Sequence, residues 1–486
     1  MICKTNQVFS TGIIALLAFL ISCESPTQHT NNEDRIQPYV DNPFYWQYKG
    51  EPLLLLGGTW QENLFNHPIG LERHLDRLKS FGGNYVRNTM SHRNDGNLFA
   101  YTNRDGKFDL DEFNIEYWQR FDDFLRMTHE RGIIVQIEVW ETWDLYEDHQ
   151  SLGGWSKHPF NPENNVNYTA EESGLPIVVD YPPAWEPTDH TFFRTVPELD
   201  NNIVALPYQQ AFVDKLLFFS LQYDHVLYCM NNETGELHQW GDYWAGYIQA
   251  KAREEGKLVV TGDMRRNHDV RHADHDYLYQ NPELYMFVDI SQNTVGEVAG
   301  QEHWDRLQWV RDRLMDHPRP INHTKIYGGG DEAANKMWRN IFGGSASSRF
   351  HRPHPHESVE YHEKSSGFGL GLGPIAQAHI LSLRMLTDSI DVFSSEPRND
   401  LLSGREPNEA YCFAQEGETC VLYFPNGGTV TLNLTNAPVG EWKMRWLNIL
   451  ESSWDQEQTL QGGIPVEIST PGEGDWAALI LPSEKL

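Results

Sequence analysis

The feature that most constrains the fold is an alternation of short apolar runs with longer amphipathic segments between residues 53 and 388. The apolar runs predict strands at residues 53–56, 85–89, 133–139, 225–230, 258–261, 286–290, 325–327 and, more weakly, 345–350. The amphipathic segments predict helices at residues 71–80, 117–131, 209–222, 243–255, 304–315, 332–342 and 374–388. Such an alternation is typical of parallel strands joined by helical crossovers. Eight units in about 340 residues predict an α/β fold, the (β/α)8 or TIM barrel.

An open doubly wound sheet fits less well, because no glycine-rich phosphate-binding loop follows the first apolar run.

Residues 144–202 interrupt the alternation, since they are rich in Pro, Asn, Glu and aromatic residues and have no clear period. A connection of this length is usually functional. It follows the third predicted strand, so we expect it on the face where barrel enzymes build their sites.

The pattern changes after the last predicted helix. Short alternating runs at residues 411–414, 419–424, 429–434, 443–447, 466–469 and 476–481 are divided by Gly, Pro and Asn, which predicts a small antiparallel β-sandwich. We therefore expect a barrel over residues 41–392 and a C-terminal antiparallel β-sandwich over residues 393–486. Cys412 and Cys420 flank a predicted turn, so a disulfide between them depends on a register that the sequence leaves open. Cys229, in an apolar run, is expected to be a buried thiol.

The first 23 residues have the pattern of an export signal. They contain Lys4, an apolar stretch over residues 12–21 and a Leu-Ile-Ser-Cys ending at Cys23. A membrane-spanning helix needs ~20 apolar residues, so the shorter stretch favours a cleaved signal. The ending resembles a bacterial lipobox, which implies a signal peptide over residues 1–22, lipidation of Cys23 and a tether over residues 23–40. We therefore expect an exported protein, lipid-anchored to the bacterial envelope at the periplasmic or cell-surface side of the outer membrane; an ordinary cleaved signal is the alternative.

Composition excludes several classes of protein. The net charge of −31 argues against a nucleic-acid partner, because phosphate binding needs a surplus of Lys and Arg. A hydrophobic content of 39% and an aromatic content of 12% exclude a disordered chain. The cysteines lack a zinc-type spacing, and prolines divide the histidines that follow the last predicted barrel strand. We therefore expect neither a cofactor nor a metal.

The residues that follow the predicted strands are the candidates for chemistry, because barrel enzymes place their sites at the C-terminal strand ends. The fourth strand ends in the sequence Cys-Met-Asn-Asn-Glu at residues 229–233. An Asn-Glu pair in this place resembles the acid/base signature of the cellulase-like clan of retaining (β/α)8-barrel glycoside hydrolases. Residues 53–61 and 84–88 resemble the clan's first two strands, and residues 339–351 and 476–481 resemble exported bacterial members with a C-terminal β-sandwich. The resemblance implies that Glu233 protonates the leaving oxygen, while Asn232 and Arg87 hold the sugar.

The seventh strand departs from the pattern of that clan, in which a second glutamate ends this strand as the nucleophile. Here the expected position falls near Lys325. Asp331 and Glu332 could replace it only if the loop at residues 328–330 folds them inward. The other candidates for a second carboxylate are Glu138 and Glu141 on the third strand, Asp263 on the fifth and Asp289 on the sixth. Carboxyl groups ~5–5.5 Å apart would indicate retention and ~6.5–9.5 Å inversion, but the sequence does not supply that distance.

Basic residues gather after three predicted strands, although the chain as a whole is acidic. They are Arg87, His92 and Arg93 after the second strand, Arg265, Arg266, His268, Arg271 and His272 after the fifth, and Arg349, His351, Arg352, His354 and His356 after the eighth. Arginine pairs bidentately with carboxylate and sulfate, so these clusters favour an anionic ligand. The alternative is that they pair with local acids such as Asp263, Asp269 and Asp274.

Aromatic residues near the predicted site favour a carbohydrate ligand, because an aromatic face suits the apolar face of a sugar ring. They are Trp60, Trp140, Trp143, Trp155, Tyr168 and Trp240, with Trp140 as a candidate stacking platform. The prediction is a lipid-anchored glycoside hydrolase that cleaves a polysaccharide or its oligosaccharides, with a uronic or sulfated glycan favoured by the basic clusters. Two alternatives remain: a polysaccharide lyase on the same scaffold, with Lys325 or His323 as base, and a non-catalytic glycan-binding lipoprotein.

Overall fold

The computed structural model describes residues 32–94, 96–146, 154–179, 190–296, 298–327, 330–352 and 371–485. Cys23 and the predicted signal peptide lie outside these residues, so export and lipid anchoring stay predictions. Within the described part of the chain, each helix is too short or too polar to cross a membrane.

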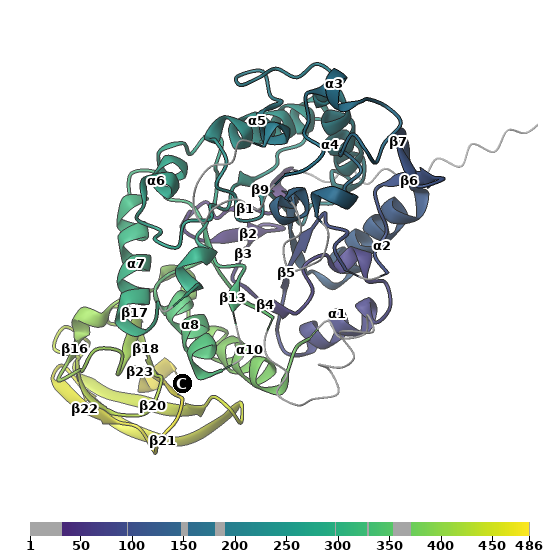
Figure 1. The fold of residues 1–486 in the computed structure, drawn as a ribbon. Coiled ribbons are helices and arrows are strands. Elements are labelled where there is room, and N and C mark those ends of the chain that lie inside the picture. Colours follow the sequence, from purple (N-terminus) through teal and green to yellow (C-terminus); the bar gives the residue numbers. More distant parts are fainter. Residues whose placement is uncertain are drawn as a thin grey trace, which may run out of the picture.

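The predicted barrel is confirmed, with its strands at the centre of the molecule (Figure 1). The strands are β4 (Leu55–Thr59), β5 (Tyr85–Thr89), β8 (Ile134–Trp140), β9 (Val226–Asn231), β10 (Thr261–Gly262), β11 (Val288–Asp289), β12 (Ile321–Asn322), β13 (Ile326–Tyr327) and β14 (Ser347–His351). Seven of them form a parallel sheet in the order β10-β9-β8-β5-β4-β14-β13, and β11 pairs with β12. The Met286 N–H donates to the Thr261 carbonyl at 2.8 Å and the Ala346 N–H to the Ile321 carbonyl at 2.9 Å. These two bonds join the sheets, so β12 and β13 together act as the seventh strand of a closed barrel.

Helices surround the strands, as Figure 1 shows. They are α1 (Leu71–Ser80), α2 (Ile115–Arg131), α4 (Leu206–Ser220), α5 (His238–Glu254), α6 (Ala273–Gln280), α7 (Gly300–Arg313), α8 (Asp331–Phe342) and α10 (Pro374–Thr387). Helix α2 begins after Asn114, whose side chain caps the Glu116 N–H, and ends at Gly132, which has a left-handed φ of +67°. The sequence did not predict α6, because it is short and mostly polar; it buries His275, Leu278 and Tyr279.

The N-terminal segment packs on the barrel from residue 32 onward, within the range predicted as a tether. Strands β1 (Gln37–Pro38), β2 (Trp46–Tyr48) and β3 (Glu51–Leu53) form a small antiparallel sheet. The Ile36 N–H donates to the Asp224 carbonyl at 2.8 Å, and the Trp46 indole donates to Asn322 Oδ1 at 3.0 Å. Residues 32–40 therefore belong to the barrel, because buried side chains such as Arg35 and Ile36 hold them there.

The chain after the barrel forms two antiparallel sheets around one apolar core. One sheet has the order β15-β17-β18-β23-β20-β21 and the other β16-β19-β22. The strands are β15 (Glu396–Pro397), β16 (Leu402–Ser403), β17 (Tyr411–Gln415), β18 (Thr419–Phe424), β19 (Thr429–Asn433), β20 (Gly440–Asn448), β21 (Ser453–Gly462), β22 (Pro465–Ser469) and β23 (Trp476–Pro482). Cys412 and Cys420 are buried free thiols with their sulfur atoms 3.4 Å apart.

This C-terminal domain packs beside α7, α8 and α10 (Figure 1). The ring of Tyr423 stacks on Trp338 of α8 with 5.0 Å between centroids, and its hydroxyl donates to Asn335 at 2.6 Å. Ser382 of α10 donates to the Ile449 carbonyl at 2.6 Å. The domain therefore lies on the outer helices of the barrel.

Candidate active site

A cleft of about 380 Å³ lies at the C-terminal ends of the barrel strands. Its lining comes from the residues that follow β4, β5, β8, β9 and β14, and from the seventh strand. The lining residues are Trp60, Gln61, Glu62, Arg93, Asn94, Trp143, Asn232, Glu233, Lys325, Tyr327 and Arg352. The cleft is therefore where barrel enzymes bind their substrates.

Glu233 lies in this cleft, where the fourth-strand motif places it. Its φ of +55° is a left-handed conformation that is costly for a residue with a side chain. The backbone is held on both sides, because the Asn232 N–H donates to the Trp140 carbonyl at 3.0 Å and the Thr234 N–H to the Met264 carbonyl at 2.9 Å. Backbone strain of this kind is typical of functional sites.

The Glu233 carboxylate is bound by three side chains. The Lys325 ammonium lies 2.8 Å from Oε1, the Tyr327 hydroxyl donates to Oε1 at 2.9 Å, and the Trp143 indole donates to Oε2 at 3.2 Å. Burial acts to raise the pKa of Glu233, but the charge of Lys325 and the hydrogen bonds from Lys325 and Tyr327 outweigh it and lower the pKa to about 2. Glu233 is therefore ionised in the free protein.

Asn232 also lines the cleft, but neighbouring side chains already bind both ends of its amide. Its Nδ2 donates to both carboxylate oxygens of Glu141 at 2.7 Å, and its Oδ1 accepts from the Lys325 ammonium. Lys325 is 1% exposed and lies between β12 and β13, where the clan resemblance predicts a carboxylate. A lysine that binds both Asn232 and Glu233 therefore stands in the position expected for the nucleophile.

Glu62, which the sequence analysis missed, is the second carboxylate among the described residues that line the cleft. It contacts Arg87 and Arg93 at 3.4 Å each, His351 at 3.6 Å, and Arg352. Burial opposes its ionisation, but the charges of Arg352, Arg93 and Arg87 hold its pKa well below the ordinary value. The sequence could have identified Glu62 by its position, because it is the first carboxylate after the first barrel strand.

Three of the four carboxylates predicted on the third, fifth and sixth strands are engaged inside the barrel rather than in the cleft. Glu138 forms a bidentate pair with Arg87, with both distances 2.5 Å. Asp263 accepts from the Asn231 side chain at 2.9 Å, and Asp289 accepts from Thr324 at 2.7 Å. All three are fully buried, and Arg87 holds Glu138 and Glu62 instead of lining the cleft.

Asp331 and Glu332, the conditional candidates for the second carboxylate, also lie outside the cleft lining. They begin α8, and Glu332 pairs with Arg339 of the same helix. Asp331 lies near Asp475 of the C-terminal domain. Burial and the charge of Asp331 raise the pKa of Asp475 to about 7. Both carboxylates therefore belong to the side of the barrel that meets the C-terminal domain.

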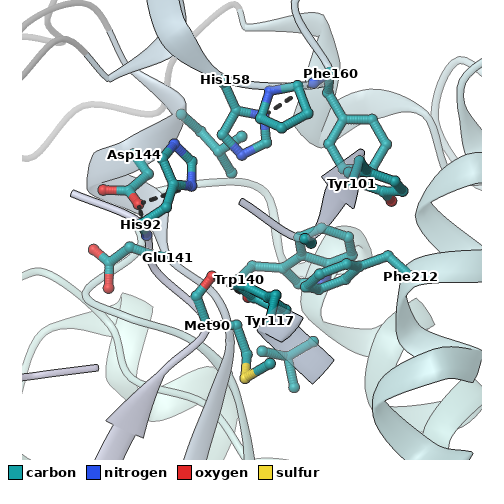
Figure 2. A pocket seen from close by; sticks show the side chains of 14 residues that line it. Met90, His92, Tyr101, Tyr117, Trp140, Glu141, Asp144, His158, Phe160 and Phe212 are labelled. Atoms are coloured by element: carbon teal, nitrogen blue, oxygen red, sulfur yellow. Dashed lines mark hydrogen bonds and ion pairs between the residues drawn. The ribbon is translucent and has the colours of Figure 1, made fainter. Parts of the chain in front are cut away.

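Glu141, which contacts Arg93 and Asn232 of the cleft, lines a smaller cavity of about 30 Å³, and Figure 2 shows that cavity's lining. His92 faces Asp144 there, with 3.7 Å between Nδ1 and Oδ2, and His158 lies beside Phe160. Burial raises the pKa of Glu141 to about 8, against the charge of Arg93. His92, a predicted substrate ligand, thus belongs to this enclosed cavity.

The aromatic residues divide between the cleft and the core. Trp140 is 3% exposed and packs against Trp240, Trp244 and Phe212, with ring centroids 5.0–5.5 Å apart, so it is a core residue and not a stacking platform. Trp155, Tyr168 and Trp240 are buried as well. Trp60 and Trp143 line the cleft and can meet a sugar ring.

Two arginines of the basic cluster after the fifth strand pair with local acids, as the alternative for this cluster predicts, and Arg265, a predicted substrate ligand, lies outside the cleft lining. Arg265 lies 2.8 Å from Asp274 and 3.6 Å from Asp263, and Arg271 lies 2.8 Å from Asp269. The eighth strand contributes differently: His351 is buried beside Glu62, and Arg352 lines the cleft. The cations of the cleft lining are therefore Arg93, Lys325 and Arg352.

No metal-binding arrangement of three or more His, Cys, Asp or Glu side chains occurs among the described residues. His354, His356 and His362 lie outside those residues.

No protein-family model and no curated protein matches this chain in sequence. Solved structures do match it in fold. A glycoside hydrolase of family 5 from Bacteroides vulgatus superimposes with a TM-score of 0.61 at 13% identity, over 93% of each chain. A second glycoside hydrolase superimposes with a TM-score of 0.60 at 11% identity, over 93% of this chain and 98% of its own. The chain therefore shares the fold of these glycoside hydrolases along nearly its whole length.

Proposed function

We propose that this protein is a glycoside hydrolase that cleaves a polysaccharide or its oligosaccharides in the cleft described above. The observation that carries the proposal is the presence of two carboxylates, Glu233 and Glu62, in one cleft at the strand ends. Glycoside hydrolysis needs one carboxyl group as the acid and a second as nucleophile or base. Trp60 and Trp143 supply aromatic surfaces for the sugar rings. The fold shared with glycoside hydrolases supports the same assignment.

The two carboxylates have different roles in this proposal. Glu62 is held ionised by its arginines, which suits a nucleophile or a base that activates water. Glu233 occupies the acid position, and it protonates the leaving oxygen once its pair with Lys325 opens. The glycosidic C–O bond breaks, the leaving oxygen takes the proton of Glu233, and water supplies the hydroxyl group of the new reducing end.

The substrate of the proposed hydrolase is an anionic glycan, uronic or sulfated. Three cations and two carboxylates line the cleft of a protein whose net charge is −31. Lys325, whose ionic partner among the described residues is Glu233, and the partly exposed Arg352 offer positive charge to an anionic group on the ligand.

The test is proton NMR of the sugars released from a panel of neutral, uronic and sulfated polysaccharides. Wild type is expected to release reducing ends, and Glu233→Gln and Glu62→Gln are each expected to lose at least about a hundredfold in rate, the scale of general acid–base catalysis. Glu332→Gln, at the start of α8, is the matched control and should keep wild-type activity. Full activity of Glu62→Gln would contradict the assignment of Glu62, and the first anomer formed would distinguish retention from inversion.

A polysaccharide lyase is the second candidate, favoured by Lys325 and Tyr327 in the cleft. In that reaction a base removes the proton at C5 of a uronate, the C4–O bond breaks, and an unsaturated sugar results. Lys325 or Arg352 would neutralise the uronate carboxylate, and the Tyr327 oxygen would act as the base. Both reactions release a reducing end, so olefinic proton signals and ultraviolet absorption from the unsaturated non-reducing end of the product would identify this reaction and contradict hydrolysis.

A non-catalytic glycan-binding protein is the third candidate, favoured by the ionised state of Glu233 in the free protein. Binding of a glycan without any product from the same panel would support it. A Glu233→Gln variant would then bind the glycan as wild type does.

A further inference from the structure

The Lys325 ammonium contacts both side chains of the fourth-strand motif in the cleft, Asn232 and Glu233. We propose that Lys325 determines substrate specificity: it binds Glu233 in the free protein and transfers to the carboxylate or sulfate of an anionic sugar unit when substrate binds, which frees Glu233 to take up a proton. This inference rests on the proposed function. It makes an anionic group on the substrate a requirement for forming the general acid.

The contacts of Lys325 suit such a transfer. An ammonium group has three N–H donors, and the contacts of Lys325 are with Glu233 Oε1 at 2.8 Å and with Asn232 Oδ1. The side chain is 1% exposed but lines the cleft, so its ammonium is largely desolvated and accessible to a bound ligand. A desolvated ammonium interacts strongly with an incoming anion, because water does not screen the pair.

Glu233 keeps hydrogen bonds when Lys325 moves away. The Tyr327 hydroxyl donates to Oε1 at 2.9 Å and the Trp143 indole to Oε2 at 3.2 Å, so the carboxyl group stays in place without the lysine. The other cations of the cleft are less able to move to a ligand. Arg352 and Arg93 both contact Glu62, and Arg93 also binds Glu141. Lys325 is therefore the cation whose movement away from Glu233 changes the protonation of this carboxylate.

The charge balance of the cleft provides the driving force. Arg93 pairs with Glu62, Glu141 and Asp144, and Arg352 pairs with Glu62, whereas the ionic partner of Lys325 among the described residues is Glu233, so a bound anion competes with one carboxylate for this lysine. Once that anion holds Lys325, burial acts on Glu233 with less opposition and favours its protonated form. The other charged or titratable groups that act on Glu233 are Tyr327, Arg87 and His268. The proton comes from solvent and later goes to the leaving oxygen.

Calorimetry with four glycans tests the inference. The probes are trigalacturonate, its carboxyl-reduced neutral form, a sulfated galacto-oligosaccharide and its desulfated form. Wild type should bind one of the anionic probes at least tenfold more tightly than its neutral partner. That binding should take up protons, measured by titration in two buffers with different ionisation enthalpies. The pair that shows the preference distinguishes carboxylate from sulfate.

Variants separate the role of Lys325 from a structural one. Lys325→Met should lose both the tenfold preference and the proton uptake, while Lys325→Arg should keep the preference. Lys336→Met is the matched control, because Lys336 is another buried lysine, on α8, whose ammonium donates to the Thr294 carbonyl. If Lys325→Met does not fold, two results still test the inference. They are the proton uptake when wild type binds an anionic probe and the preference of Lys325→Arg for that probe.

Two results would overturn the inference while leaving the proposed function intact. One is equal affinity of wild type for charged and neutral partners, and the other is a preserved preference in Lys325→Met. Absence of binding by all four glycans would contradict the proposed function itself, and the inference with it.

Discussion

The Asn232 amide donates to both carboxylate oxygens of Glu141, with each distance 2.7 Å. Glu141 follows β8 and Asn232 follows β9, so this contact joins two neighbouring strand ends below the cleft. Asn232 in turn accepts from Lys325, which binds Glu233. The position of the proposed acid therefore depends on a chain of polar contacts that starts at a buried carboxylate.

Replacement of Glu141 by glutamine should lower kcat at least tenfold with a smaller change in KM. A glutamine replaces one carboxyl oxygen with an NH2 group, to which neither Asn232 nor Arg93 can donate, so Asn232 and Lys325 lose their fixed positions. Steady-state kinetics on a glycan that the wild type cleaves gives both constants. Glu171→Gln, on the exposed surface of α3 (Ala170–Ser173), is the control, and an unchanged kcat for Glu141→Gln would contradict this role.

The buried pair of Glu233 and Lys325 should reveal itself in stability. Glu233→Gln leaves the lysine charge buried without its partner, so we expect the free energy of unfolding to fall by about 3–5 kcal/mol at neutral pH. The double variant Glu233→Gln/Lys325→Met should recover most of that loss. Urea unfolding measures all three proteins. Asp200→Asn, which breaks the exposed pair with Arg194, should cost at most about 1 kcal/mol.

The same pair predicts a pH dependence. The pKa of Glu233 is about 2 in the folded protein, below its ordinary value of 4.5, so the folded state binds fewer protons than the unfolded state between these values. The stabilisation is therefore complete above the ordinary pKa and is lost as the pH falls toward the folded pKa. The difference in unfolding free energy between wild type and Glu233→Gln should shrink over this range, and a constant difference would contradict the assigned pKa.

Two tryptophans should respond in opposite ways to replacement by alanine. Trp60→Ala should weaken glycan binding about tenfold, or about 1.4 kcal/mol, with little change in stability, because Trp60 lines the cleft. Trp140→Ala should cost about 3–5 kcal/mol of stability, because it empties part of the aromatic core. Calorimetric binding and thermal unfolding measure the two effects, and a stable Trp140→Ala variant with weakened binding would reverse the assignments.

The predicted lipid anchor has a matched pair of cysteines for its test. Cys23→Ser should abolish labelling by radioactive palmitate in a bacterial host and move the protein from the membrane to the soluble fraction. Cys3→Ser, within the same leader, should leave labelling and fractionation unchanged. Membrane retention of an unlabelled Cys23→Ser variant would contradict the lipobox interpretation.

Much of the fold was predictable because its signals are local. Strand β5 spans residues 85–89, as its apolar run predicts, and α2 ends at Arg131 because Gly132 follows. Glu233 was predictable for the same reason, since a residue directly after a strand must lie at the strand end. Helix α6 was not predicted, because its sequence is too short and too polar to show a helical period.

The sequence by itself therefore determined the barrel, the C-terminal sheets and the position of Glu233 at a strand end. Only the tertiary structure decided which charges meet there: Glu62 with its arginines, Arg265 with Asp274, and Lys325 with Glu233. It also decided that Trp140 faces the core while Trp60 faces the cleft. The physical reason is that strand and helix periods act between near neighbours in the chain. The charge and pKa of a carboxylate depend instead on side chains that only the closed barrel brings within a few ångströms.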